Sequence, residues 1–226
     1  MSSSTPLFLL DVDNTLLNND YVKQSIWESL VSVLGKEEAH HFWNHRQKIR
    51  EEEGIVSFPK AVRAYCSETK EETCDFRLHM IFSNIDFKGA LYDCVPGVIQ
   101  QLRTIGHVAI FTEGDTLYQE MKVKNSTLAQ YVDDVFIYEH KLEHISEIRE
   151  EYPNHTFILV EDKPDNIDTF KAQEPHTRAI RVCQGHYADD HPAHEHADVV
   201  VDSIEELASF TKNHPLFAHL ATGTDA

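Results

Sequence analysis

The segment LFLLDVDNTLL, residues 7–17, decides the fold of this chain. Four consecutive apolar residues, 7–10, predict a buried β-strand, and Asp11 and Asp13 follow it directly. Taken alone, two acidic residues after a strand often only cap the next turn or helix. Two like charges at the end of a buried segment are costly, however, unless other groups compensate them. The segment therefore raises the question of which parts of the chain lie next to this pair.

Further short apolar runs resemble the first one. They lie at 107–111, 134–138, 156–160, 178–182 and 198–201. Helical patterns separate most of them, as at 116–131, 141–151 and 166–173. Strands that alternate with helices predict an α/β fold, a Rossmann-like parallel β-sheet core flanked by helices. In such sheets ligands bind beyond the carboxyl ends of the strands.

Residues 18–88 interrupt this alternation and have helical patterns throughout. Ile26, Leu30, Val33 and Leu34 follow the spacing i, i+4, i+7, i+8 of a core-facing helix. More helices are expected at 36–52, 57–67 and 71–83. The predicted units are a catalytic core (1–17 and 89–210), an all-helical cap inserted after strand 1 (18–88) and a loose C-terminal tail (211–226).

Composition excludes several classes of function. The 226 residues include 41% hydrophobic ones, as in globular proteins, and carry a formal net charge of −18. This charge argues against binding to nucleic acid or to an anionic membrane surface. No basic region precedes the apolar run 7–10, so neither a secretory signal nor a membrane anchor is expected there. The four cysteines form no CxxC pair, which predicts reduced thiols in a cytoplasmic protein.

Polar residues with complementary chemistry follow two later strands. Thr112 ends the run 107–111, where its hydroxyl and the backbone N–H groups of Glu113 and Gly114 are placed to hold anionic oxygens. Considered alone, Thr112 is equally consistent with a simple turn. Lys141 is the first cation after 134–138. Considered by itself, it is more simply interpreted as a solvated residue at the start of a helix.

Two further carboxylates, Glu161 and Asp162, follow the run 156–160. Together with Asp11 and Asp13 they would bind Mg²⁺, a hard cation that accepts oxygen ligands. A lysine and a hydroxyl nearby would contact the remaining oxygens of a phosphate. This combination suits phosphoryl transfer, in which positioning and charge neutralisation do most of the work.

The order of DVDNT, Thr112, Lys141 and EDKPDN resembles the four motifs of the haloacid dehalogenase superfamily. The resemblance covers residues 7 to about 207, and the helical insertion occupies the position of that superfamily's cap. It implies that Asp11 is the nucleophile and Asp13 the general acid and base, while Thr112 and Lys141 bind the phosphoryl group. It also implies that Asp11, the Asp13 backbone carbonyl and Asp162 hold Mg²⁺.

An acid two residues after the nucleophile separates reactions within this superfamily. Dehalogenases release halide and need no proton for the leaving group, so Asp13 favours hydrolysis of a phosphate ester. We therefore expect a Mg²⁺-dependent phosphatase acting on a small phosphorylated metabolite through an aspartyl-phosphate. The alternatives are a dehalogenase or phosphomutase of the same superfamily, and a protein that binds a phosphorylated ligand without turnover.

The last motif departs from the superfamily pattern, because position 166 is Asn where many members have a second acid. Either Glu161 or Asp165 would then support the metal site, and we prefer Glu161 because adjacent acid pairs also occur in the superfamily. The candidates for substrate specificity in the cap are Asn18, Asn19, Arg46 and Arg50.

Two histidine-rich segments remain. His186, His191, His194 and His196 lack the spacing of a zinc-binding helix, and Pro192 interrupts them, so a solvated loop is expected. His186 and Tyr187 follow a strand closely enough to line the mouth of the active site. His40, His41 and His45 lie in a helical pattern of the cap, where 41 and 45 share a face, and we interpret them as surface or domain-interface residues rather than a metal site.

Overall fold

The computed structural model describes residues 5–188 and 196–217. Its centre is a sheet of six parallel strands in the order β3-β2-β1-β4-β5-β6. The strands are β1 (Thr5–Leu10), β2 (His107–Glu113), β3 (Asp134–Tyr138), β4 (His155–Glu161), β5 (Arg178–Val182) and β6 (Val199–Val201). The predicted Rossmann-like parallel sheet is confirmed, and every predicted strand is present.

Both faces of the sheet are buried, which explains the continuous apolar runs. Because side chains alternate along a strand, Phe8 and Leu10 belong to one apolar cluster and Leu7 and Leu9 to the other. The helices around the sheet are α5 (Val95–Arg103), α6 (Thr116–Asn125), α7 (Ile145–Glu151) and α8 (Pro164–Gln173). Residues of α5 and α6 join the first cluster, and residues of α7 and α8 the second.

The carboxyl end of β1 lies between those of β2 and β4. The backbone N–H of Asp11 donates to the carbonyl of Val160 at 3.0 Å, so the sheet fixes the backbone of the acidic segment. Strands from distant parts of the sequence therefore end at one edge.

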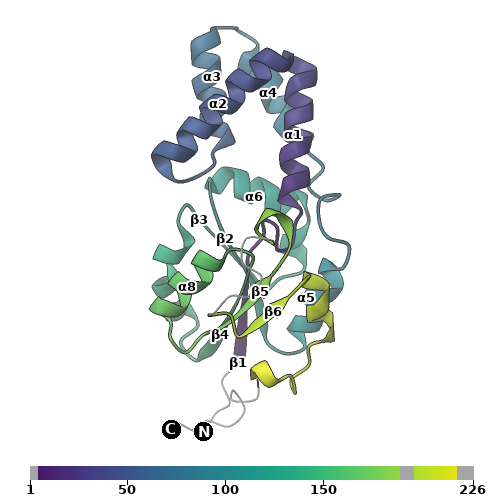
Figure 1. Cartoon of the computed structure of the whole chain (residues 1–226), viewed down its shortest axis with the longest axis vertical. Helices are drawn as coiled ribbons and strands as arrows, with labels where there is room; N and C mark the ends of the chain where they lie inside the picture. Colours follow the sequence, from purple (N-terminus) through teal and green to yellow (C-terminus); the bar gives the residue numbers. More distant parts are fainter. Residues whose placement is uncertain (1–4, 189–195, 218–226) are drawn as a thin grey trace.

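Four helices follow β1 and stand beyond this edge (Figure 1). They are α1 (Asn19–Leu34), α2 (Lys36–Glu53), α3 (Phe58–Thr69) and α4 (Cys74–Ser83). Aromatic side chains pack between them, as where the ring centroid of Phe42 lies 5.7 Å from that of Tyr65 and 6.1 Å from that of Phe82. This insertion has the position expected of a cap.

A buried hydrogen bond is among the contacts that join the insertion to the core. Ser57 caps the N-terminus of α3 and Asp115 caps that of α6, each by accepting a backbone N–H in the first turn. The Ser57 hydroxyl also donates to the Asp115 carboxylate. The two helix starts are thus held together by their own capping groups.

The cysteine prediction was wrong for one pair. Cys66 and Cys74 form a disulfide between the end of α3 and the start of α4, whereas Cys94 and Cys183 are free thiols. The expectation of a cytoplasmic location therefore loses part of its basis. None of the described helices has both the length and the apolar character needed to cross a membrane.

More of the C-terminal segment packs against the core than the sequence predicted. A 3₁₀ turn, η5 (Pro215–Phe217), buries Leu216 and Phe217, and the Phe217 ring lies 5.8 Å from that of Phe8 on β1. The prediction of a loose tail at 211–226 overlooked these two apolar side chains. Residues 218–226 lie outside the described part of the chain.

Candidate active site

The residues expected to act together lie at the carboxyl edge of the sheet. Asp11 follows β1, Thr112 is the second-last residue of β2, and Lys141 begins the 3₁₀ turn η2 (Lys141–Glu143). Glu161 ends β4, and Asp162 follows it. All are buried. The parallel topology thus brings together residues separated by up to 151 positions, since Asp11 and Asp162 belong to one group of neighbouring carboxylates.

Lys141 connects two of these acids. Its fully buried ammonium group donates to Asp11 Oδ1 at 2.6 Å, to Glu161 Oε2 at 2.7 Å and to the Phe111 carbonyl at 3.1 Å. Burial alone would lower the pKa of Lys141, but the two carboxylates raise it above its ordinary value. Lys141 is therefore a fixed positive charge beside Asp11.

Glu161 is occupied by hydrogen bonds on both oxygens. Its Oε1 accepts from the backbone N–H groups of Asp162 and Lys163, and its Oε2 accepts from Lys141 and from the Asn166 amide. Although burial opposes ionisation, Lys141 and Lys163 lower the pKa of Glu161 to about 2. Glu161 therefore holds Lys141 in place, and Asn166 supports Glu161. Asp165, the other candidate, is exposed on α8.

Asp162 has the opposite environment. It is 1% exposed, and within the described residues neither of its oxygens has a hydrogen-bond partner. Burial and the neighbouring charges of Glu161 and Asp11 raise its pKa to about 10. Carboxylate oxygens of Asp11, Glu161 and Asp162 lie within 4.8 Å of one another. The buried, unpaired oxygens of Asp162 beside the other two carboxylates fit a hard divalent cation such as Mg²⁺.

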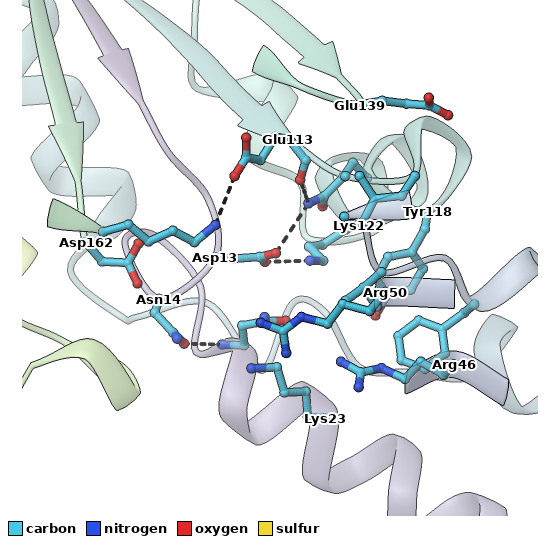
Figure 2. Close-up of a pocket in the computed structure, with 18 of the residues that line it drawn as sticks. Asp13, Asn14, Lys23, Arg46, Arg50, Glu113, Tyr118, Lys122, Glu139 and Asp162 are labelled. Atoms are coloured by element: carbon cyan, nitrogen blue, oxygen red, sulfur yellow. Dashed lines mark hydrogen bonds and ion pairs between the residues drawn. The ribbon is translucent and has the colours of Figure 1, made fainter. Parts of the chain in front are cut away.

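Asp13 faces a lysine that sequence reasoning missed. The buried ammonium of Lys122, on α6, lies 2.5 Å from Asp13 Oδ1, and the Gln119 amide lies 3.3 Å from Oδ2 (Figure 2). Burial would raise the pKa of Asp13, but Lys122 outweighs it and lowers the pKa. The only sequence signal was the i, i+3 spacing of Gln119 and Lys122, which places both on one face of a helix.

The turn after β2 differs from the expected anion cradle. Thr112 is buried at the strand end, but the Gly114 N–H donates to the Tyr138 carbonyl at 2.9 Å and is not free for a phosphoryl oxygen. The Glu113 side chain forms an ion pair of 3.0 Å with Lys163. Glu113 and Gly114 therefore line the site without forming the predicted pair of N–H donors.

A pocket of about 200 Å³ lies between the sheet edge and the helical insertion. The core contributes Asp13, Asp162 and Lys163 to it, while α1 and α2 contribute three cations, which reach toward the acids in Figure 2. These cations are Lys23, Arg46 and Arg50. Of the proposed specificity residues, Asn19 also lines the pocket. Asn18 does not, because it caps α1.

Another short segment, which contains His186, also lines this pocket. His186 Nδ1 lies 3.0 Å from the Asn14 amide nitrogen and 3.1 Å from Asp20 Oδ1. Gly185 permits this approach, since a Cβ there would lie 2.4 Å from Asn14 Cγ. Tyr187 lines the same pocket, so both residues lie where the sequence suggested. His191 and His194 lie outside the described residues.

Comparison with solved structures places this architecture among known proteins. A haloacid dehalogenase-like hydrolase from Burkholderia xenovorans LB400 is 27% identical, with a TM-score of 0.84 over 92% of this chain and 99% of that one. The magnesium-bound HAD-hydrolase YfnB from Bacillus subtilis is 17% identical, with a TM-score of 0.61 over 91% and 97%. An L-2-haloacid dehalogenase from Xanthobacter autotrophicus is 12% identical, with a TM-score of 0.58 over the same shares.

No family model and no curated protein matches the chain by sequence. The assignment therefore rests on the fold, on the first of these similarities and on the order of the four motifs around one sheet edge. The chain belongs to the haloacid dehalogenase superfamily of hydrolases.

Proposed function

We propose that the protein is a Mg²⁺-dependent phosphatase that hydrolyses a small phosphomonoester through an aspartyl-phosphate. The observation that carries this proposal is Asp13, an acid two residues after Asp11 that faces the pocket. A phosphate ester needs a proton for its leaving alcohol, and Asp13 is in the position to supply it.

In the first step, an Asp11 oxygen attacks phosphorus, and the bond from phosphorus to the ester oxygen breaks. The leaving alcohol takes its proton from Asp13. In the second step, Asp13 takes a proton from water as that water attacks the aspartyl-phosphate, which releases phosphate and restores Asp11. Lys141, 2.6 Å from Asp11, positions this carboxylate and favours its ionised form for the attack, whereas burial and the charge of Glu161 raise the pKa of Asp11 to about 7.

Asp11 and Asp162 would hold the Mg²⁺, together with the backbone carbonyl of Asp13. The ion would neutralise charge on the phosphoryl group during transfer. Lys122 favours the ionised form of Asp13, which suits its role as a base in the second step. The negative charge of a bound phosphoryl group acts in the other direction and favours the protonated acid needed in the first step.

The substrate is expected to be small and anionic. A pocket of about 200 Å³ accommodates few atoms beyond a phosphate, and Lys23, Arg46 and Arg50 face it from the insertion. These cations oppose the repulsion that a chain of net charge −18 exerts on an anion. Because Asp11 is 5% exposed, we infer that the insertion moves to admit the substrate.

The decisive experiment measures hydrolysis of para-nitrophenyl phosphate with Mg²⁺ and with a chelator. We expect turnover only with the metal, its loss in Asp11→Asn, and a decrease of about 10²- to 10⁴-fold in Asp13→Asn. Asp165→Asn, an exposed acid on α8, is the matched control.

The similarity to L-2-haloacid dehalogenases makes carbon–halogen cleavage the second candidate. Chloride release from 2-chloropropionate in chelator, without phosphatase activity, would replace our proposal with that reaction. Phosphate binding without any turnover would instead indicate a ligand-binding protein.

A further inference from the structure

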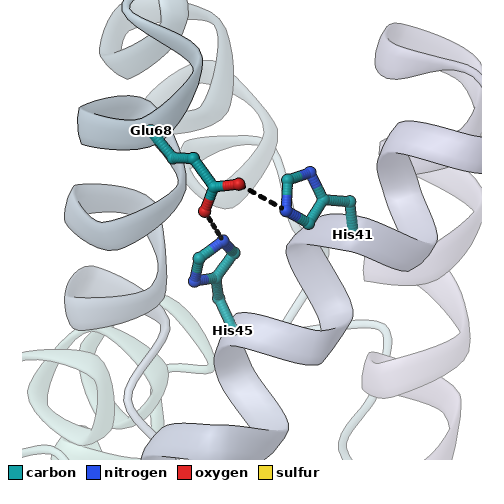
Figure 3. A group of neighbouring side chains, drawn as sticks. All are labelled: His41, His45 and Glu68. Atoms are coloured by element: carbon teal, nitrogen blue, oxygen red, sulfur yellow. Dashed lines mark ion pairs between the residues drawn. The ribbon is translucent and has the colours of Figure 1, made fainter.

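A second group of metal-ligand side chains lies in the helical insertion, outside the active-site pocket. His41 and His45 are one helical turn apart on α2 and face Glu68 on the neighbouring helix α3 (Figure 3). The spacing i, i+4 places both imidazoles on one side of α2. None of the three side chains lines the pocket described above.

The distances within this group are compatible with those between the ligands of a metal ion. Nε2 of His41 lies 3.2 Å from Glu68 Oε1, and Nε2 of His45 lies 3.1 Å from Glu68 Oε2. All three residues offer a ligand atom within 4.8 Å of the others. Bonds from Zn²⁺ to nitrogen and oxygen are about 2.0–2.2 Å, so neighbouring ligand atoms of a tetrahedral site are about 3.3 Å apart.

Hydrogen bonding does not account for this arrangement. The Nε2 atom of His45 is buried, and no group in the described part of the chain forms a hydrogen bond with it. Its contact with Glu68 is also longer than the 2.7–2.9 Å or so of a charge-assisted hydrogen bond. The Glu68 side chain is 57% exposed, so water has access to the remaining position around a bound ion.

Neighbouring groups hold the histidines in orientation. The ring of Tyr65 lies 5.6 Å from that of His41 and 6.2 Å from that of His45. The Tyr65 hydroxyl donates to Glu38 at 2.7 Å, and the same Glu38 oxygen lies 3.7 Å from the other ring nitrogen of His41, Nδ1. A metal-bound histidine characteristically directs its second nitrogen at a carboxylate.

We propose that His41, His45 and Glu68 bind a transition-metal ion, with Zn²⁺ the best fit and water as the fourth ligand. Two imidazoles and a carboxylate suit Zn²⁺, whereas Mg²⁺ prefers oxygen ligands alone. The ion joins α2 to α3 and stabilises the insertion. This site is independent of the acidic cluster at the sheet edge, which uses oxygen ligands.

The test titrates the full chain with Zn²⁺ in excess Mg²⁺, which occupies the acidic cluster, and follows heat release and melting temperature. We expect one Zn²⁺ per chain and a rise in melting temperature. His45→Gln and Glu68→Gln should each weaken binding by more than about tenfold. Replacing Zn²⁺ with Co²⁺ should give the intense visible absorption of a tetrahedral ion, and these variants should lose it.

Two controls separate this site from other histidines. His40→Ala changes a neighbouring residue on α2 whose ring packs against Trp27 at 4.6 Å, and it should bind Zn²⁺ as the parent does. The double variant His191→Ala/His194→Ala should also retain binding. The proposal is overturned if the parent binds no Zn²⁺, if His45→Gln binds it normally, or if the double variant abolishes binding. Circular dichroism of each variant confirms that the fold is intact.

Discussion

Replacing Asp162 with asparagine should separate the stability of the metal-free protein from its response to Mg²⁺. In the parent, a buried carboxylate has no hydrogen-bond partner for either oxygen among the described residues. Leaving a buried polar group unsatisfied costs about 1–3 kcal/mol, and more for a charge. Asparagine has the same shape and cannot ionise, whereas Asp162, whose pKa is about 10, avoids a buried charge only by protonation. In chelator, the free energy of unfolding of Asp162→Asn should therefore equal or exceed that of the parent by about 1–3 kcal/mol.

Mg²⁺ should reverse this order. A ligand at 100 times its Kd stabilises the folded state by about 2.7 kcal/mol. In a chain of this size, each kcal/mol corresponds to a shift in Tm of about 2–4 °C, so the parent should gain roughly 5–10 °C. The variant has lost the carboxylate that needs the ion and should gain little. The two melting curves should thus exchange order between chelator and saturating Mg²⁺.

The assay is thermal unfolding followed by circular dichroism at fixed pH, with and without Mg²⁺. Asp165→Asn is the matched control, because it removes an exposed acid three residues away and should respond to Mg²⁺ as the parent does. Our reasoning fails if Asp162→Asn is markedly less stable than the parent in chelator, or if Mg²⁺ stabilises both proteins equally.

Other predictions concern single side chains. Lys122→Met removes the ion pair of Asp13, and we expect kcat to fall about tenfold to a hundredfold with little change in KM, measured by steady-state phosphatase kinetics. Arg46→Ala removes a buried cation of the pocket and should raise KM by about tenfold with kcat nearly unchanged. Burial, with the nearby charge of His107, lowers the pKa of His155 below 6.5. The unfolded chain therefore binds a proton at His155 more readily than the folded chain does. The contribution of the neutral imidazole to the free energy of unfolding is fully present above pH 6.5 and is lost as the pH falls. His155→Gln should flatten the dependence of Tm on pH in that range.

The sheet could be predicted from sequence because each strand is a continuous apolar run. Leu7–Leu10, for example, are fully buried because both faces of the sheet are covered, and a helix with one buried face needs no such continuous run. The site followed from the same reasoning, since Asp11, Lys141 and Glu161 each come just after or at the end of a strand. Parallel strands place these ends at one edge whatever the length of chain between them.

Other features depend on contacts that no local pattern records. Cys66 and Cys74 are paired because a turn brings the end of α3 back to the start of α4. Lys122 looks like an ordinary solvated helix residue, and only the packing of α6 on the sheet buries it beside Asp13. Helix α5 was not predicted although its pattern is local: its buried residues follow the spacing i, i+3, i+4, i+7, and Pro96 is typical of a first helical turn.

The distribution of cations around the sheet edge points to the position of the metal. Despite the net charge of −18, four acids of the site form ion pairs with three lysines. The pairs are Lys141 with Asp11 and Glu161, Lys122 with Asp13, and Lys163 with Glu113. Within the described residues, Asp162 forms no such ion pair and no hydrogen bond through its carboxylate oxygens. A buried carboxylate is stable only when another charge compensates it or when it is protonated. When Asp162 is ionised, the compensating positive charge must therefore come from a ligand, which supports our proposal of a divalent cation at this site.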